Sequence, residues 1–164
     1  MRVAVISDTH LPRGARRIPE SCLAQLRAAD LILHAGDFVA ESAFAELVAL
    51  GPPVHAVHGN MDDAALRQRL PSRLVVEAGG LRIGMTHDAG PRAGREERLT
   101  GRFPGCAAVI YGHTHEPQVA RAGAVWILNP GSPTERRRAP THTMLILEVA
   151  DGRISPQLIS FRAT

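Results

Sequence analysis

The feature that most constrains this chain is the alternation of apolar, β-branched runs with helical patterns over its first 70 residues. The runs are RVAVIS at 2–7, DLILHAG at 30–36 and PVHAVHG at 53–59. Periodic apolar residues predict helices over 19–28, 41–50 and 62–70. Strands that are joined through helices in this way form right-handed crossovers and pair in parallel. We therefore expect a parallel sheet in the N-terminal half.

The rest of the chain predicts strands that are joined by tight turns. Segment 72–87 has a Gly-Gly pair between two apolar runs, which is typical of a β-hairpin. A helix is predicted over 92–102, and strands are predicted over 106–112, 117–123, 124–131, 141–152 and 153–161. Ala-Gly-Ala and Asp-Gly junctions favour hairpins, so we expect the C-terminal half to be largely antiparallel. Two packed sheets with helices outside, an α/β fold, are the simplest closure.

The length of 164 residues predicts a single domain that spans 1–164. The composition is 45% hydrophobic, and no apolar run approaches the ~18 residues that a membrane span needs. The apolar region at the start is too short for a signal peptide, so we expect a cytoplasmic protein without a membrane partner. Cys22 and Cys106 form no C-x-x-C motif, which favours buried, reduced thiols over a disulfide or a cysteine metal site.

The charge balance suits an anionic substrate. All 19 basic residues are arginines, and the formal net charge is +3. Guanidinium is always charged and matches the geometry of phosphate. The arginine excess is also consistent with a nuclease, but one Trp, one Tyr and four Phe leave few aromatic side chains for base stacking. We therefore favour a small phosphate ester or diester over nucleic acid as the partner, and the oligomeric state stays open.

Metal-capable side chains follow the predicted strands where turns begin. They are Asp8, His10, Asp37, Asn60, His87, His113 and His115. In sheets with helical crossovers the ligand site lies at the carboxyl ends of the strands, so these side chains are expected to meet at one edge. Residues two apart in an extended segment point the same way, so Asp8 with His10 and His113 with His115 each form a pair.

The donor types indicate which metal chemistry is expected. Oxygen and imidazole ligands without thiolate favour a catalytic manganese, iron, zinc or nickel site over a structural zinc site. Seven ligands exceed what one ion needs, which favours two ions that share a bridging carboxylate. The alternative is seven unrelated polar residues that cap turns and strand ends.

Five motifs in order resemble one known family. SDTH at 7–10, HAGD at 34–37, GNMD at 59–62, the single His87 and GHTH at 112–115 are similar to the calcineurin-like metallophosphoesterases. NPGSP at 129–133 resembles the small bacterial and archaeal phosphodiesterase branch, so the likeness covers about residues 3–133. The resemblance implies a four-layer αββα sandwich with two mixed β-sheets.

The resemblance also implies how the ligands divide. Asp8, His10, Asp37 and His115 would hold one divalent ion, and Asp37, Asn60, His87 and His113 would hold the other, with Asp37 as the bridge. Manganese is the favoured metal, with iron, nickel or zinc as alternatives. The implied reaction is hydrolysis of a phosphodiester by in-line attack of a hydroxide that bridges the metals at Asp37. Asn60 and His87 would then lie near the phosphate.

Several neighbouring residues have two interpretations each. His34 either orients a ligand or is a core histidine with satisfied hydrogen bonds, and Asp62 either caps the helix that follows or supports the site. Arg13 is a candidate substrate contact, and the other arginines that either contact phosphate or are merely solvated are Arg16, Arg17, Arg136, Arg137 and Arg138. His55, His58 and His142 are interpreted as structural.

One residue departs from the family pattern. Family phosphatases commonly carry His directly after the Asn ligand, and the small phosphodiesterases often carry Cys there, but this chain has Met61, which is a candidate substrate-pocket residue. A thioether donates no proton, so turnover of esters with poor leaving groups is in doubt. The fold also resembles protein-binding subunits of trafficking complexes that have lost efficient catalysis. A non-catalytic scaffold is therefore the alternative function, although here all seven ligand positions remain.

Overall fold

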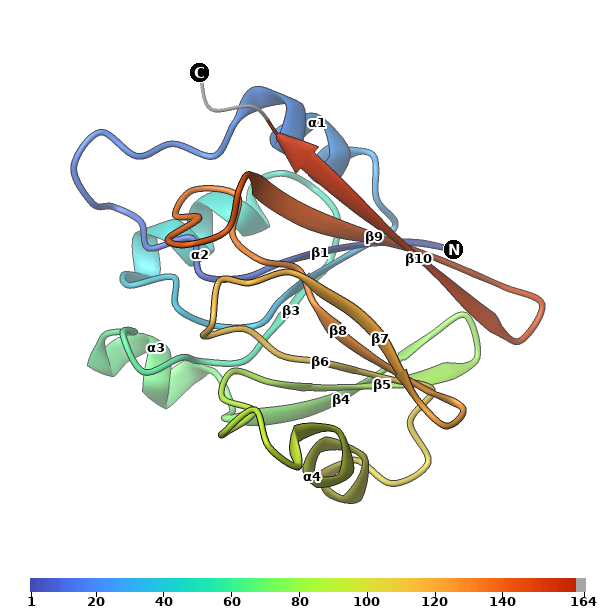
Figure 1. The fold of residues 1–164 in the computed structure, drawn as a ribbon. Helices are drawn as coiled ribbons and strands as arrows, with labels where there is room; N and C mark the ends of the chain where they lie inside the picture. The colour runs from blue at the N-terminus through green and yellow to red at the C-terminus, as the bar shows by residue number, and fades with distance from the viewer. Residues whose placement is uncertain (162–164) are drawn as a thin grey trace.

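The computed structural model describes residues 1–161, which form two five-stranded β-sheets packed face to face (Figure 1). The first sheet has the order β10-β9-β1-β2-β3. Its strands are β1 (Arg2–Ile6), β2 (Leu31–His34), β3 (Val54–Ala56), β9 (His142–Ala150) and β10 (Arg153–Phe161). The central strands β1, β2 and β3 are parallel, whereas β9 and β10 are antiparallel to their neighbours. The sheet is therefore mixed.

The second sheet has the order β4-β5-β6-β8-β7. Its strands are β4 (Arg73–Ala78), β5 (Leu81–Thr86), β6 (Ala108–Ile110), β7 (Gln118–Ala122) and β8 (Val125–Asn129). The predicted hairpins at β4–β5, β7–β8 and β9–β10 are confirmed. The expectation of a largely antiparallel C-terminal half is wrong at β6, because both of its neighbours, β5 and β8, run parallel to it. β5 and β6 are joined through a helix, the connection that favours parallel pairing, whereas β6 and β8 are separated in sequence by β7, and no turn motif indicates their pairing.

Four helices lie outside the sheets and complete an αββα arrangement. They are α1 (Glu20–Arg27), α2 (Glu41–Val48), α3 (Ala64–Arg69) and α4 (Arg95–Arg102). Figure 1 shows α1 and α2 over the first sheet and α4 over the second. The four-layer sandwich with two mixed sheets is thus confirmed. No helix within residues 1–161 is both long and apolar enough to cross a membrane.

Alternation along the strands explains the layers. In β1, Val3 and Val5 face the second sheet, while Ala4 and Ile6 face the helices, and all four are fully buried. The inner layer joins them to residues such as Met85 of β5. Two further clusters lie between helices and sheets, and Cys22 and Cys106 are free, buried thiols within them, as the sequence predicts.

Candidate metal centre

The loops that follow β1 and β2 run side by side at the carboxyl edge of the first sheet. The backbone N–H of Asp8 donates to the carbonyl of Gly36 at 2.9 Å, and that of His10 donates to the carbonyl of Asp37 at 3.0 Å. This pairing continues the parallel register of the two strands beyond their ends. It brings the residues of SDTH next to those of HAGD.

The first group of ligand atoms comprises Asp8, His10 and His115. Their ligand atoms all lie within 4.8 Å of one another, and all three residues are buried. The Nε2 atom of His115 lies 3.3 Å from Oδ1 of Asp8 and 3.3 Å from Nε2 of His10. Such separations match those between neighbouring ligands of one ion, because ligand bonds of ~2.1 Å at near-right angles place the ligand atoms ~3 Å apart.

The second group comprises Asp37, His87 and His113, again with ligand atoms within 4.8 Å of one another. The Oδ1 atom of Asn60 joins them, at 3.1 Å from Nε2 of His87 and 3.0 Å from Nδ1 of His113. Asn60 and its neighbour Met61 are exposed. The second group is therefore the side of the cluster that opens to solvent.

Asp37 lies between the two groups. Its Oδ2 atom is 3.3 Å from Nε2 of His87 and 3.7 Å from Nε2 of His10. Its other oxygen, Oδ1, accepts a hydrogen bond of 2.8 Å from the backbone N–H of Met61, which holds the carboxylate in this orientation. The structure thus brings together all seven side chains that the sequence singles out as metal ligands.

The backbone conformation of the ligands differs from the sequence-based argument. Five ligand residues have positive φ angles, namely Asp8 (55°), His10 (46°), Asp37 (62°), His113 (68°) and His115 (60°). Left-handed conformations cost non-glycine residues about 1–2 kcal/mol each, and they concentrate at functional sites. The pairs at spacing two are therefore formed by strained turns and not by the alternation of an extended strand. Moreover, His113 and His115 contribute to different groups.

Glycines allow the backbone to approach the carboxylates closely. A Cβ atom on Gly59 would lie 2.0 Å from Oδ1 of Asp37, and one on Gly112 would lie 2.8 Å from Oδ2 of Asp8. Contacts below 3.0 Å require the carboxylate or the chain to shift. The glycines of the GNMD and GHTH motifs are therefore part of the site's geometry.

Asp62 supports the ligand loops and is not the helix cap. Its carboxylate accepts hydrogen bonds from the backbone N–H groups of Gly59 (2.7 Å), Val39 (2.7 Å) and Asp37 (3.2 Å). The N-cap of α3 is instead Asp63, whose side chain accepts from the N–H of Leu66. The capping interpretation of Asp62 is therefore wrong by one residue. Its buried carboxylate ties the loop after β2 to the loop after β3.

Both interpretations of His34 describe part of its environment. Its Nδ1 atom accepts from the N–H of Gly36 at 3.1 Å, so its Nε2–H donates to Oγ1 of Thr9, which also lies at 3.1 Å. The ring stacks on Phe38 and is fully buried. Burial holds the pKa of His34 well below its usual value, so the ring is neutral. It is a satisfied core histidine that also joins the two ligand loops.

The NPGSP loop braces the cluster from behind. The hydroxyl of Ser132 donates to the carbonyl of Asp8 at 2.8 Å, and the side-chain amide of Asn129 donates to the carbonyl of Gly112 at 3.0 Å. The sequence indicated a family likeness for this loop but not its structural role. Asn and Ser on either side of a Pro-Gly pair are typical of turns in which side chains form hydrogen bonds to the backbone, and this pattern could have indicated that role.

The imidazoles are oriented as metal ligands are. The Nδ1–H of His87 donates to the carbonyl of Ala35 at 2.8 Å, and the Nδ1–H of His115 donates to the carbonyl of Glu135 at 2.5 Å, which turns both Nε2 atoms toward the cluster. The Nδ1 atom of His10 is buried without a hydrogen-bond partner among residues 1–161. A donor set of nitrogen and carboxylate oxygen fits divalent metals.

Comparison with known proteins identifies the family. Residues 1–152 match the calcineurin-like phosphoesterase superfamily domain. The chain belongs to this family. The chain is 37% identical over 161 residues to a probable metallophosphoesterase of Methanothermobacter thermautotrophicus, a match that covers 97% of this chain and 92% of that protein.

Two further relatives bear on the site. A phosphodiesterase of Methanocaldococcus jannaschii is 26% identical over 144 residues, which covers 80% of this chain and 83% of that protein. Among solved structures, Vps29 of Entamoeba histolytica complexed with Zn²⁺ is similar, with a TM-score of 0.76 and 25% identity over 98% of this chain and 99% of that one. Family and residue groups together imply divalent metals.

The pKa values of Asp37 and His87 are shifted in opposite directions by their mutual contact. Burial opposes ionisation of Asp37, but the hydrogen bond and charge of His87 outweigh it and lower the pKa of Asp37 to about 2. Burial alone would lower the pKa of His87, yet Asp37 and Asp8 raise it to about 8. Burial raises the pKa of Asp8 to about 7 and lowers the pKa of His115 to about 4. Without metal, Asp37 and protonated His87 form an ion pair at neutral pH.

We expect metal affinity to rise as the pH increases from about 6 to about 8 and then to level off. Below its pKa of about 8 His87 carries a proton on Nε2, and below its pKa of about 7 Asp8 is protonated, so metal must displace both protons. Calorimetric titration in two buffers of different ionisation enthalpy measures the protons released. A constant affinity without proton release across this range would contradict the assignment, as would an optimum for hydrolysis near pH 4.

Two residues expected in the substrate pocket differ in their placement. Met61 is 46% exposed and lies at the open side of the cluster, where its backbone N–H donates to Oδ1 of Asp37. Arg13 is exposed, and no hydrogen bond or ion pair within residues 1–161 ties its side chain to the ligands. The arginine that reaches the cluster from the same loop is Arg16, which lies 3.0 Å from Glu135. Sequence analysis had named Arg16 only as one of a group and had missed Glu135.

Proposed function

We propose that this metallophosphoesterase is a dinuclear, metal-dependent phosphodiesterase. The observation that carries the proposal is the position of Asp37, whose Oδ2 atom lies within 3.7 Å of a histidine from each ligand group. A carboxylate in that place suits a bridge between two cations. The similarity to a phosphodiesterase of Methanocaldococcus jannaschii supports diesters as substrates.

Each ion would take four protein ligands, with Asp37 shared. Asp8, His10, Asp37 and His115 would hold the first ion, and Asp37, Asn60, His87 and His113 the second. Manganese is the favoured metal, and iron, nickel or zinc are alternatives. When bound, two divalent ions lower the pKa of a water molecule and offset charge on phosphoryl oxygens. Zn²⁺ in the related Vps29 structure shows that the fold accepts such an ion in that protein.

The chain's own residues explain why an anionic ester would bind. Only two carboxylates, those of Asp8 and Asp37, stand among the seven ligands, so two divalent ions would leave a net positive centre. Substrate would approach over Asn60 and His113, which face solvent. A hydroxide derived from water and held beside Asp37 would attack phosphorus in line, breaking the bond to the leaving oxygen. That oxygen then needs a proton.

The test is hydrolysis by protein that has been stripped of metal and reloaded with one metal at a time. We expect manganese-dependent cleavage of an activated aryl phosphodiester, slower cleavage of the matching monoester, and loss of both on chelation. Single-stranded DNA run beside them should persist, whereas its digestion would favour a nuclease. Metal binding without hydrolysis of any of the three substrates would contradict the proposal and support a protein-binding scaffold.

Met61 yields a prediction about leaving groups. No proton donor stands at this position, so rates should depend steeply on the acidity of the leaving alcohol, and aryl diesters should react far faster than alkyl ones. Met61→His should help poor leaving groups most, by part of the ~100-fold that a positioned acid contributes. Rates are measured across a leaving-group series with metal content matched. Equal effects on all leaving groups would mean that Met61 only lines the pocket and that water or His58 supplies the proton.

A further inference from the structure

Two side chains from distant loops meet beside the first ligand group. Arg16 belongs to the loop between β1 and α1, and Glu135 belongs to the loop that follows β8. The Nη2 atom of Arg16 lies 3.0 Å from Oε1 of Glu135, and the two side chains are only 28% and 21% exposed. The ion pair therefore lies at the rim of the cluster, where solvent screens it incompletely.

Both partners keep one polar atom unused. The Oε2 atom of Glu135 lies 3.6 Å from Nε2 of His10, and it has no hydrogen-bond partner within residues 1–161. The Nη1 atom of Arg16 is likewise buried with no acceptor in that part of the chain. A buried charged donor without an acceptor is costly, commonly by more than an ordinary hydrogen bond gains. An anion that entered beside Glu135 would supply the missing acceptor once the side chain of Arg16 turns Nη1 toward it.

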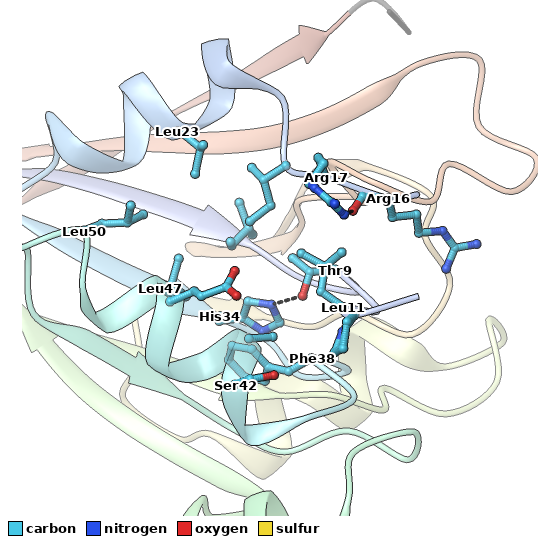
Figure 2. A pocket seen from close by; sticks show the side chains of 15 residues that line it. Thr9, Leu11, Arg16, Arg17, Leu23, His34, Phe38, Ser42, Leu47 and Leu50 are labelled. Carbon is cyan, nitrogen blue, oxygen red and sulfur yellow. Dashed lines mark hydrogen bonds between the residues drawn. The ribbon is translucent and has the colours of Figure 1, made fainter. Parts of the chain in front are cut away.

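Arg16 lies between a neighbouring cavity and the first ligand group, and its ion pair with Glu135 connects it to that group. Its residue lines a cavity of about 500 Å³ between α1, α2 and the loop, together with Leu11, Phe38 and Leu47. Figure 2 shows that the side chain of Arg16 extends away from the other labelled side chains that line this cavity. The guanidinium is thus separated from the apolar walls and held by Glu135 at the edge of the ligand cluster.

We propose that Arg16 contacts the phosphate group of the substrate through Nη1 while Nη2 remains bonded to Glu135. Arg16 would then be a substrate-binding residue, and Glu135 a positioning residue that acts through it. The planar guanidinium can serve both partners at once, because its donors point in fixed, different directions. The inference rests on the proposed function, since it places a phosphodiester anion at the metal cluster.

The other arginines nearby lack this arrangement. Arg17 donates to the backbone carbonyl of its neighbour Arg16 at 2.7 Å and is exposed. Arg137 is exposed as well, and its Nη1 atom lies 3.5 Å from the carbonyl of His113, at the limit of a hydrogen bond. Within residues 1–161, Arg16 is the arginine that combines an ion pair next to a ligand histidine with a buried, unused donor.

The test measures binding of inorganic phosphate to the metal-loaded protein by calorimetry, beside steady-state kinetics. Arg16→Gln should weaken phosphate binding and raise KM about tenfold or more, as expected for one lost charge-assisted hydrogen bond. Arg16→Lys keeps the positive charge but lacks the planar guanidinium, so its phosphate affinity should lie between those of the natural protein and Arg16→Gln. Glu135→Ala should weaken binding as Arg16→Gln does, and Glu135→Gln, which keeps an acceptor for Arg16 but loses the charge, should weaken it by less.

A second ion pair provides the matched control. Arg27 and Glu20 lie 2.7 Å apart on the exposed surface of α1, so Arg27→Gln and Glu20→Gln make the same charge changes away from the site. These variants should bind phosphate like the natural protein. Metal content is measured for every variant, because the inference requires that both ions stay bound in Arg16→Gln and Glu135→Ala.

Two outcomes would overturn the inference. Unchanged phosphate affinity in Arg16→Gln would remove Arg16 from the binding site. Loss of metal in Glu135→Ala but not in Arg16→Gln would make Glu135 a metal ligand and not a positioning residue. If the natural protein hydrolyses diesters while phosphate binding ignores Arg16, only this inference fails. If the natural protein hydrolyses none, the proposed function fails even where Arg16→Gln weakens phosphate binding.

Discussion

Asp37→Asn is expected to abolish hydrolysis and to weaken metal binding at both positions. The carboxylate lies between the two ligand groups, with Oδ2 at 3.3 Å from His87 and 3.7 Å from His10. A neutral amide lacks the negative charge that a bridge between two cations needs. We expect kcat/KM to fall on the order of a thousandfold or more, as when a group that stabilises charge at a reacting centre is removed.

Two independent measurements check this prediction, namely the metal affinity of the variant and the pKa of His87 in the metal-free variant. Asp37 contributes to the pKa of about 8 of His87, so in the metal-free variant the pKa of His87 should fall, which NMR detects. Asp63→Asn is the matched control: it makes the same chemical change at the exposed N-cap of α3, where Asn caps as well as Asp. Two tightly bound ions and full activity in Asp37→Asn would refute the bridging role.

Gly59→Ala is expected to disrupt the same carboxylate without changing any ligand. The added Cβ atom would lie 2.0 Å from Oδ1 and 2.5 Å from the backbone nitrogen of Asp37, and neither atom belongs to a flexible chain end. Relief requires the loops after β2 and β3 to separate, which strains the hydrogen bonds that Asp37 and Val39 donate to Asp62. We expect metal affinity to fall by about 10–100-fold and overpacking to cost about 1–3 kcal/mol of stability.

Gly101→Ala is the control for this substitution. Gly101 lies in α4, and a Cβ atom there would meet nothing within 4 Å. Because alanine favours helix over glycine, the control should keep its metal affinity and gain up to about 1 kcal/mol of stability. Thermal unfolding with and without metal, together with metal titration, separates the two variants. A metal affinity of Gly59→Ala equal to that of the natural protein would contradict the prediction, because it would show that the loops accommodate the added methyl group without moving Asp37.

The amino-acid pattern was sufficient for most of the elements and for naming the seven side chains that the structure brings together. Buried strands such as β1 and β2 appear in the sequence as apolar runs, because both of their faces are covered. The helices α1 and α2 appear as segments with apolar residues at helical spacing, because only one face of each is buried. Side chains such as Asp8, Asp37 and His87 could be named in advance, since strand ends of such sheets converge on one edge. Residue type and short-range periodicity were therefore sufficient to predict these elements and these side chains.

Other features depend on which segments meet in space. The parallel pairing of β6 with β8 joins strands that are separated in sequence by β7, and no turn sequence encodes it. The cap of α3 is Asp63 and not Asp62, because the latter is drawn into hydrogen bonds with the loops after β2 and β3. An aspartate carries no local mark that distinguishes these two tasks.

What the sequence determined by itself is the α/β class, the layered fold through its motif order, and the identity of the seven ligand-type residues. Only the tertiary structure decided that Asp37 stands between two groups, that the ligands occupy left-handed turns, and that Arg16 meets Glu135 beside His10. The physical reason is range. Propensity and burial act over a few neighbouring residues, whereas these contacts exist because two packed sheets hold loops from distant parts of the chain at one edge.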